Sequence, residues 1–215
     1  KSKERFGALI DVGSGSVLVA IVHSQPSQLH PYIVWSHREH AALRNIDSLE
    51  QSAKAVMSAL MSASMAIDSD GRRSLQAYSP GASITDLQCS VAAPWSYTVT
   101  KSINYKQESS FTVTEELINE LKNTVEDRIQ DELQQNSILS DLELEIITQG
   151  TMDCTTNGYR VAHPEGQKAF EITLTHGNAV TQRYLVEAIT DLRDKLFAQA
   201  ETKYISFILM MYVVA

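Results

Sequence analysis

Apolar runs that alternate with turn-forming residues open this chain. Phe6–Ile10 and Val17–Val22 are apolar, and the six residues between them, Asp11–Ser16, include two glycines and two serines. The second run is rich in β-branched side chains, which pack well on a pleated surface and lose rotamer freedom in a helix. The pattern predicts two strands joined by a tight turn, and Pro31–Ser36 is expected to form a third strand.

Helical spacing of apolar residues marks three later segments. Asp47 with Glu50 or Ser48 with Gln51 forms a capping box that begins the first helix, which is expected to end near Asp68–Gly71. Thr112 or Thr114 begins the second helix, whose many acidic residues are expected to face solvent. Its apolar stripe consists of Leu117, Leu121, Val125, Ile129 and Leu133. The third helix follows the apolar positions of 180–196.

The first helix carries a methionine stripe at Met57, Met61 and Met65. Because thioethers fill irregular gaps in protein interiors, this stripe is interpreted as part of the core. Asp68, Asp70 and Gly71 are only part of a calcium-binding loop, since the glycine comes too early and the distal glutamate is missing. A turn is therefore predicted there.

The other segments are predicted to be strands and loops. Residues 72–85 are polar, contain Pro80-Gly81 and are expected to form a loop. Asn157-Gly158 favours a hairpin, and a second turn is expected at 163–166. The expected strands are 87–92, 97–105, 142–152, 158–162, 169–176 and 205–215.

Composition narrows the class of protein. The formal net charge of −8 argues against nucleic acid as a partner, because such partners usually require basic surfaces. Cys89 and Cys154 match neither a redox nor a zinc spacing, which favours buried thiols in a reducing compartment and leaves a single disulfide as the alternative. The longest apolar run, Ile205–Ala215, is too short to span a membrane. Because the sequence lacks an initial Met and stops within that run, it is interpreted as part of a longer protein.

The turn at Asp11–Ser16 is the main candidate for chemistry. Its glycines lead into a strand, whereas a dinucleotide fingerprint or a Walker loop leads into a helix. Backbone amides in such a turn can bind phosphate oxygens while Asp11 holds Mg²⁺ through water. The alternative is that the glycines and serines only form the turn. His37 and His40 lack the spacing of a helical zinc motif, and no nucleophile motif is present.

Two motifs carry a resemblance to a known family. Residues 6–19, FGALIDVGSGSVLV, and residues 158–176, GYRVAHPEGQKAFEITLTH, resemble the first phosphate motif and the extra subdomain of the FtsA and PilM branch of bacterial actin-like ATPases. The resemblance implies an α/β fold: a ribonuclease H-like actin-fold half-domain with a small inserted α+β subdomain. The implied boundaries are 1–93 and 181–215 for the half-domain and 94–180 for the insertion.

The resemblance also implies roles for the residues of the turn. Asp11 would organise Mg²⁺, while Gly13, Ser14 and Gly15 would present backbone groups to the phosphates of ATP. Ser16 stands where many relatives have a lysine, so a cation that contacts phosphate would be missing. The second phosphate motif, the adenosine-binding glycines and the second half of the fold are not in this chain. It would supply one wall of a nucleotide cleft and would be inactive alone, although the full-length protein could be a weak ATPase.

Three functions follow as hypotheses. The first is a cytoplasmic scaffold of cell division or type IV pilus assembly that binds ATP and Mg²⁺ in its full-length form. It would act by protein–protein interaction or polymerisation, at the inner face of the membrane through missing parts or partners. The second is a nucleotide-free interaction module that uses the inserted subdomain, with protein partners or self-association through that unit. The third is a relative of the sugar and acid kinases, because a fold alone does not fix a function.

Overall fold

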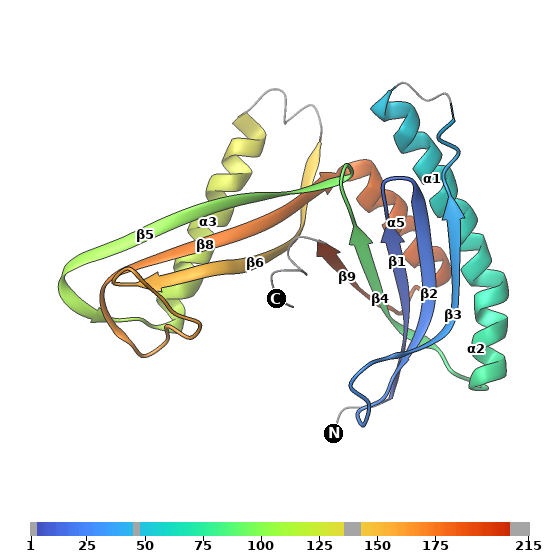
Figure 1. The fold of residues 1–215 in the computed structure, drawn as a ribbon, viewed down its shortest axis with the longest axis horizontal. Helices are drawn as coiled ribbons and strands as arrows, with labels where there is room; N and C mark the ends of the chain where they lie inside the picture. Colours follow the sequence, from blue (N-terminus) through green and yellow to red (C-terminus); the bar gives the residue numbers. More distant parts are fainter. Residues whose placement is uncertain (1–3, 45–47, 136–142, 207–215) are drawn as a thin grey trace. The chain divides into compact units, whose positions relative to one another are not determined.

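The computed structural model describes residues 4–44, 48–135 and 143–206. These residues form two compact units (Figure 1). The first unit comprises the described residues up to Ser96 and those from Arg183 onward, and the second unit comprises Tyr97–Gln182. The second unit thus interrupts the first one along the sequence, and each unit is described by itself.

The first unit is built on a five-stranded sheet. Its strands are β1 (Arg5–Val12), β2 (Ser16–Ser24), β3 (Tyr32–His40), β4 (Ile84–Val91) and β9 (Glu201–Ser206). The order across the sheet is β3-β2-β1-β4-β9. β2 is antiparallel to β1 and β3, while β4 is parallel to β1 and to β9. This arrangement is the expected ribonuclease H-like α/β class.

Two crossover connections link the parallel strands of this sheet. The first runs from β3 through α1 (Leu49–Ala66), a π-helical turn (Ile67–Gly71) and α2 (Arg72–Tyr78) to β4. The second reaches β9 through α5 (Arg183–Leu196). Right-handed crossovers in the same direction place their helices on one face of the sheet. Ile10, Val12, Val17, Ile21 and Leu87 from the strands form much of the core beneath them.

The expected turn at residues 68–71 and the loop at 72–85 are wrong for the segment up to Tyr78. The helix continues through Gly71, whose missing side chain allows close packing: a Cβ there would lie 3.1 Å from atoms of Ile21, Ile67 and Trp35. Arg72 and Arg73 form ion pairs with Asp68 and Asp70, at 2.6 and 3.4 Å. These carboxylates therefore support a continuing helix, and the glycine serves packing.

The methionine stripe of α1 is also different from the expectation. Met61 and Met65 are 61% and 70% exposed, so they are not core residues. The buried face of α1 consists of Val56, Ala59, Leu60, Ala63 and Ser64. Small residues dominate this face because α1 packs directly on β2 and β3, and the long methionines extend from the sides of the helix.

The second unit is a four-stranded sheet packed on one long helix. The strand order is β5-β8-β6-β7, with β6 antiparallel to both β8 and β7. Thr114 caps the helix, α3 (Glu115–Gln135), because its hydroxyl oxygen accepts a hydrogen bond from the amide of Leu117 at 3.2 Å. The strands are β5 (Ser96–Thr112), β6 (Leu144–Thr156), β7 (Tyr159–Arg160) and β8 (Lys168–Gln182).

The core of the second unit lies between α3 and its sheet. Leu121, Val125, Ile129 and Leu133 from the predicted stripe are buried there, together with Ile172 and Leu174 of β8. The sequence therefore predicted the inner face of α3 correctly, although Leu117 is only partly buried.

Strand lengths were less predictable. β3 extends to His40, β5 to Thr112 and β8 to Gln182, each beyond its expected end, so the last helix begins at Arg183. The expected last strand, residues 205–215, lies almost entirely outside the described residues, and β9 begins at Glu201. No described helix combines the length and the apolar character that crossing a membrane requires.

Candidate functional site

The turn between β1 and β2 lies at the carboxyl end of β1. Val12 pairs with Val17, so Gly13, Ser14 and Gly15 form the connection between the strands. β4 is parallel to β1, and its carboxyl end lies beside the same turn. Ligands of open α/β sheets bind at the carboxyl ends of parallel strands. The topology therefore places the predicted turn at the usual edge for a ligand.

The segment that follows β4 forms hydrogen bonds with the backbone of this turn and of the end of β1. The indole N–H of Trp95 donates to the carbonyl oxygen of Gly13 at 2.9 Å, and the amide of Ala92 donates to that of Val12 at 3.0 Å. Trp95 is itself buried, at 4% exposure. Within the turn, the amide of Gly13 donates to the carbonyl oxygen of Ser16 at 2.9 Å. These bonds hold the turn in one conformation before any ligand binds.

The turn leaves two amide donors for a ligand. The amide of Gly13 already donates to Ser16 within the turn, so it is not one of them. Among the described residues, the amides of Ser14 and Gly15 have no hydrogen-bond acceptor. Ser14 is exposed, and Gly15 and Ser16 are partly exposed. Two neighbouring amides at this turn are therefore available as hydrogen-bond donors to a ligand oxygen.

Both glycines of the turn are explained by close contacts. A Cβ at Gly13 would lie 3.2 Å from the carbonyl oxygen of Ser16, which is part of the backbone and cannot easily move. A Cβ at Gly15 would lie 3.1 Å from a terminal methyl carbon of Leu43, a side chain that can adjust. Gly13 is therefore the stricter requirement. Neither glycine is among the positive-φ positions of the described chain.

A cation lies at the turn, but it comes from a different strand than expected. The guanidinium of Arg38 on β3 donates a hydrogen bond to the side-chain oxygen of Ser16 at 2.8 Å. Ser16 and Arg38 are 22 residues apart in sequence. The serine that replaces the lysine of many relatives therefore positions an arginine, which binds phosphate well through its planar fork of donors. Arg38 is therefore a cation close to the turn, although the lysine of many relatives is replaced by Ser16.

The strand registers place Asp11 and Arg38 on the same face of the sheet. Arg38 pairs with Leu18, Leu18 pairs with Asp11, and Asp11 pairs with Ser90. Neighbouring strands lie about 4.8 Å apart, so the backbones of Asp11 and Arg38 are separated by about 10 Å. The Asp11 carboxylate and the Arg38 guanidinium thus belong to one row of residues across β1, β2 and β3, near the turn with the free amides. Leu18 lies between them in the same row and on the same face of the sheet.

A site for Mg²⁺ in a nucleotide complex needs fewer protein ligands than a site for a metal ion alone. Among the described residues, no group of three or more His, Cys, Asp or Glu side chains lies close enough to hold a metal. Mg²⁺ in nucleotide sites, however, keeps several waters and uses one or two carboxylates together with phosphate oxygens. Asp11 could serve as the carboxylate, while Arg38 and the amides of Ser14 and Gly15 would hold phosphate oxygens.

The remaining candidates from the sequence have structural roles. His37 contacts the carboxylate of Glu39 at 3.1 Å and stacks on Trp35. Cys89 and Cys154 are buried free thiols, so no disulfide joins them. Burial raises the pKa of Cys89 to about 12, which keeps this thiol protonated and unreactive.

No protein-family model and no curated protein sequence matches the chain. Among solved structures, a PilM-PilN type IV pilus biogenesis complex is similar, at 13% identity and a TM-score of 0.40 over 94% of this chain and 46% of that one. The cytoplasmic domain of EpsL, an inner membrane component of the type II secretion system of Vibrio cholerae, is 10% identical, with a TM-score of 0.36 over 94% of this chain and 57% of that one. The Aquifex aeolicus PPX-GPPA enzyme is 15% identical, with a TM-score of 0.28 over 42% of this chain and 27% of that one.

This chain spans less than two thirds of the length of each of these three structures. All three TM-scores are below 0.5.

Proposed function

We propose that this chain is the first half of an actin-like scaffold protein that binds ATP and Mg²⁺ at the turn between β1 and β2 in its full-length form. The observation that carries the proposal is the arrangement around that turn: two free amides, the Arg38 guanidinium and the Asp11 carboxylate at the carboxyl end of β1. Asp11 organises Mg²⁺ through water, and Arg38 with the amides of Ser14 and Gly15 holds the phosphates. The rest of the cleft comes from the missing second half.

In this proposal the protein acts in the cytoplasm, at the inner face of the membrane, in cell division or pilus assembly. Nucleotide binding holds the two halves of the actin-like fold in one arrangement and so shifts the population of assembly-competent molecules. The inserted subdomain, which corresponds to the second unit, provides a surface for protein partners or self-association. The free thiols of Cys89 and Cys154 are consistent with a reducing compartment.

Nucleotide binding by the full-length protein tests this proposal. We expect ATP with Mg²⁺ to raise the melting temperature and ATP with excess EDTA to raise it less, because ligands that bind only the folded state stabilise it. Arg38→Ala should weaken ATP binding about 10- to 100-fold, which corresponds to the loss of a hydrogen bond to a charged group. Asp11→Ala should remove most of the Mg²⁺ dependence.

A matched pair of control variants lies at the other end of the same sheet. Arg5 and Asp86 form an ion pair at 3.6 Å, away from the turn. Arg5→Ala and Asp86→Ala remove the same charges as the two test variants and should leave ATP affinity unchanged. No stabilisation of the wild-type protein by ATP, or equal losses in test and control variants, would show that the turn is not a nucleotide site.

A second candidate function is a nucleotide-free interaction module, and exposed aromatic residues in the second unit favour it. Tyr159 and Phe170 are 78% and 52% exposed there. Aromatic residues at protein surfaces are common anchors of interfaces. Replacing both by Ala in the full-length protein should abolish retention of a cellular partner in this case, while ATP would have no effect on the melting temperature.

A further inference from the structure

The outer side of α1 is unusual for a helix that faces solvent. Between Ala55 and Ile67 its sequence contains only Ala, Ser, Val, Met, Leu and Ile, without a charged residue. Ser58, Met61, Ser62 and Met65 are exposed. Helices at a protein surface usually carry charged or polar residues on the face that contacts solvent. An uncharged outer face with two exposed methionines indicates a surface that another chain covers.

A groove lies between this helix and α5. Its volume is about 310 Å³. Each helix contributes residues at the spacing of a single helical stripe, and the lining is mostly apolar. From α1 and the turn that follows it come Met57, Leu60, Met61, Ser64, Met65 and Asp68; from α5 come Ala188, Asp191, Leu192, Lys195 and Leu196.

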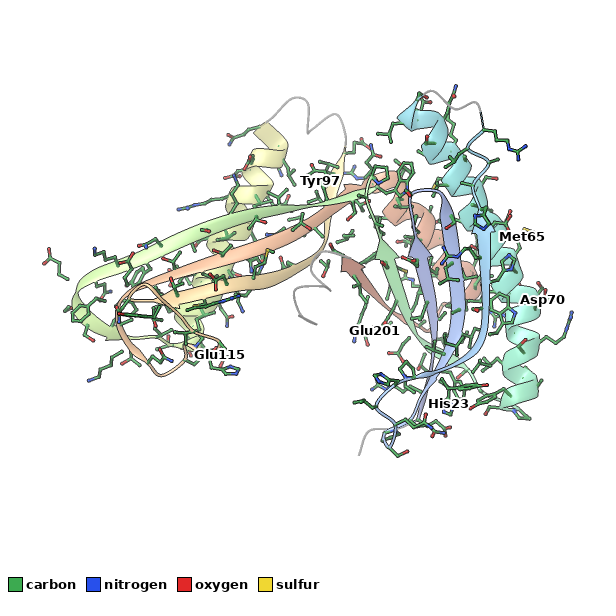
Figure 2. The ribbon with its side chains drawn as sticks, viewed as in Figure 1. His23, Met65, Asp70, Tyr97, Glu115 and Glu201 are labelled. Atoms are coloured by element: carbon green, nitrogen blue, oxygen red, sulfur yellow. The ribbon has the colours of Figure 1, made fainter. Side chains whose placement is uncertain are left out.

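Met61 and Met65 line this groove, and their side chains also protrude from the helix surface. Figure 2 marks Met65 on α1. Since the methionine side chain is unbranched and polarizable, it adapts to apolar surfaces of many shapes. The same surface therefore presents protruding side chains and a hollow that can receive such side chains. A surface with both features can pair with a copy of itself.

The charges at the edge of the groove cancel. The carboxylate of Asp68 is paired with Arg72 at 2.6 Å. Asp191 and Lys195 have opposite charges and lie one turn apart on α5. A groove that receives a basic helix would be expected to have an acidic edge, which this groove lacks. The whole chain, by contrast, has a net charge of −8.

This neutrality matters most for contact between identical chains. In a two-fold contact, residues near the axis face their own copies, so a charge of one sign there repels itself. Two acidic chains can approach with little repulsion only where the surface is locally neutral. The α1–α5 groove is such a surface, and its apolar lining provides the attraction.

We propose that the α1–α5 groove binds a second copy of this chain in a two-fold contact, in which Met61 and Met65 of each copy enter the groove of the other. This interface lies in the first unit and is separate from the self-association proposed for the inserted subdomain. It also does not require nucleotide at the β1–β2 turn. The proposal therefore stands if the nucleotide site fails.

Sedimentation velocity of the full chain over a range of concentrations tests the contact. We expect the wild-type chain to form a dimer reversibly, and the Met61→Glu, Met65→Glu double variant to weaken it by roughly 100-fold or more, because unpaired carboxylates are costly to bury. The matched control is the Leu29→Glu, Ile33→Glu double variant. It adds the same charge at two exposed apolar positions of the first unit, which are 91% and 59% exposed and do not line the groove. This control should dimerise like the wild type.

Cross-linking gives an independent result. Met65→Cys should form an intermolecular disulfide under mild oxidation, whereas Leu29→Cys should form much less of it. The native Cys89 and Cys154 are buried and should not contribute. A wild-type chain that stays monomeric at every concentration would overturn the proposal. Binding of a helix of another protein in the groove, without dimer formation, would overturn it as well. A dimer that survives both glutamates would also overturn it, because the interface would then lie elsewhere.

Discussion

The helices α1 and α3 are similar on the inside and opposite on the outside. They have 18 and 21 residues, and each buries a continuous stripe against the sheet of its own unit. α3 carries charged residues along its outer side, and Lys101 of β5 pairs with Glu132 of α3 at 2.5 Å. α1 has no charged residue between Ala55 and Ile67. The apolar stripe identifies the buried face of either helix, but only the charge of the outer face separates a solvated helix from one that a partner covers.

Matched leucines test whether the two inner faces are equivalent. Leu60 of α1 and Leu121 of α3 are 2% and 4% exposed. We expect Leu60→Ala and Leu121→Ala to lower the free energy of unfolding by about 2–5 kcal/mol each, because each leaves a cavity. Urea denaturation, monitored by hydrogen–deuterium exchange, should show each loss of stability in the unit that carries the substitution. If one variant costs less than 1 kcal/mol, the inner faces are not equivalent.

Gly71, the last residue of the π-helical turn that follows α1, tests the close approach of this helical segment to the strands. The alanine Cβ would meet three side chains at 3.1 Å, from Ile21, Ile67 and Trp35. We expect Gly71→Ala to destabilise the first unit by about 1–3 kcal/mol through overpacking, despite the higher helix propensity of alanine. Alanine at the exposed Ser69 is the control, and it should have little effect. A stabilised Gly71→Ala variant would show that the side chains can move apart.

Low pH should destabilise α3 more than α1, because a histidine is buried beneath α3. His176 of β8 is 3% exposed, and neither of its ring nitrogens has a hydrogen-bond partner. Burial lowers its pKa, and the charge of Lys122 on α3 lowers it further, while Glu126 of α3 lies 3.9 Å from its Nε2. In the unfolded chain His176 therefore becomes protonated near pH 6.5, whereas in the folded unit it becomes protonated only at a lower pH.

The stability of the second unit should consequently fall as the pH decreases below about 6.5, and it should level off below the folded pKa of His176. Hydrogen–deuterium exchange of α3 at pH 7.5 and 5.5, corrected for the intrinsic rates, measures this loss. His176→Phe should reduce the dependence in α3, and α1 should change less than α3. Identical pH profiles of the wild type and His176→Phe would contradict the assignment.

The smallest effect on stability is expected on the outer faces. Met65→Lys in α1 and Glu120→Lys in α3 should each change the free energy of unfolding of the isolated chain by less than about 0.5 kcal/mol, because both positions are exposed. The two variants should differ in self-association, which Met65→Lys weakens and Glu120→Lys does not. Thermal denaturation at a low concentration and sedimentation at a high one separate the two effects.

Local patterns in the sequence predicted much of the fold. The β1–β2 hairpin follows from two apolar runs around glycines, the second of them rich in β-branched residues, and the inner face of α3 follows from its leucine, valine and isoleucine spacing. The starts of α1 and α3 were each predicted with two alternative caps, and the structure shows Ser48 and Thr114, whose hydroxyl oxygens each accept a backbone hydrogen bond at 3.2 Å. These features depend on residues that are close in sequence, so a single sequence is sufficient to find them.

The errors involve contacts between distant residues. The helix does not end at Gly71 because that glycine contacts β2 and β3, and nothing in its own neighbourhood indicates this. Arg38 was missed as a cation at the turn because the expected third strand ended at Ser36, whereas β3 continues to His40. Continuing the strand pairing by four residues would have placed Arg38 near Ser16, so the signal was present but depended on strand length.

The sequence by itself determined that a tight turn within Asp11–Ser16 joins two strands, that α3 buries one face, and that the chain is an α/β protein. These conclusions follow from side-chain periodicity and backbone preferences, which act over a few residues. Only the tertiary structure decided that Met61 and Met65 are exposed, that the amide of Gly13 is used internally, and that Arg38 reaches Ser16. Each of these depends on strand register and helix packing, which bring together groups that the sequence keeps apart.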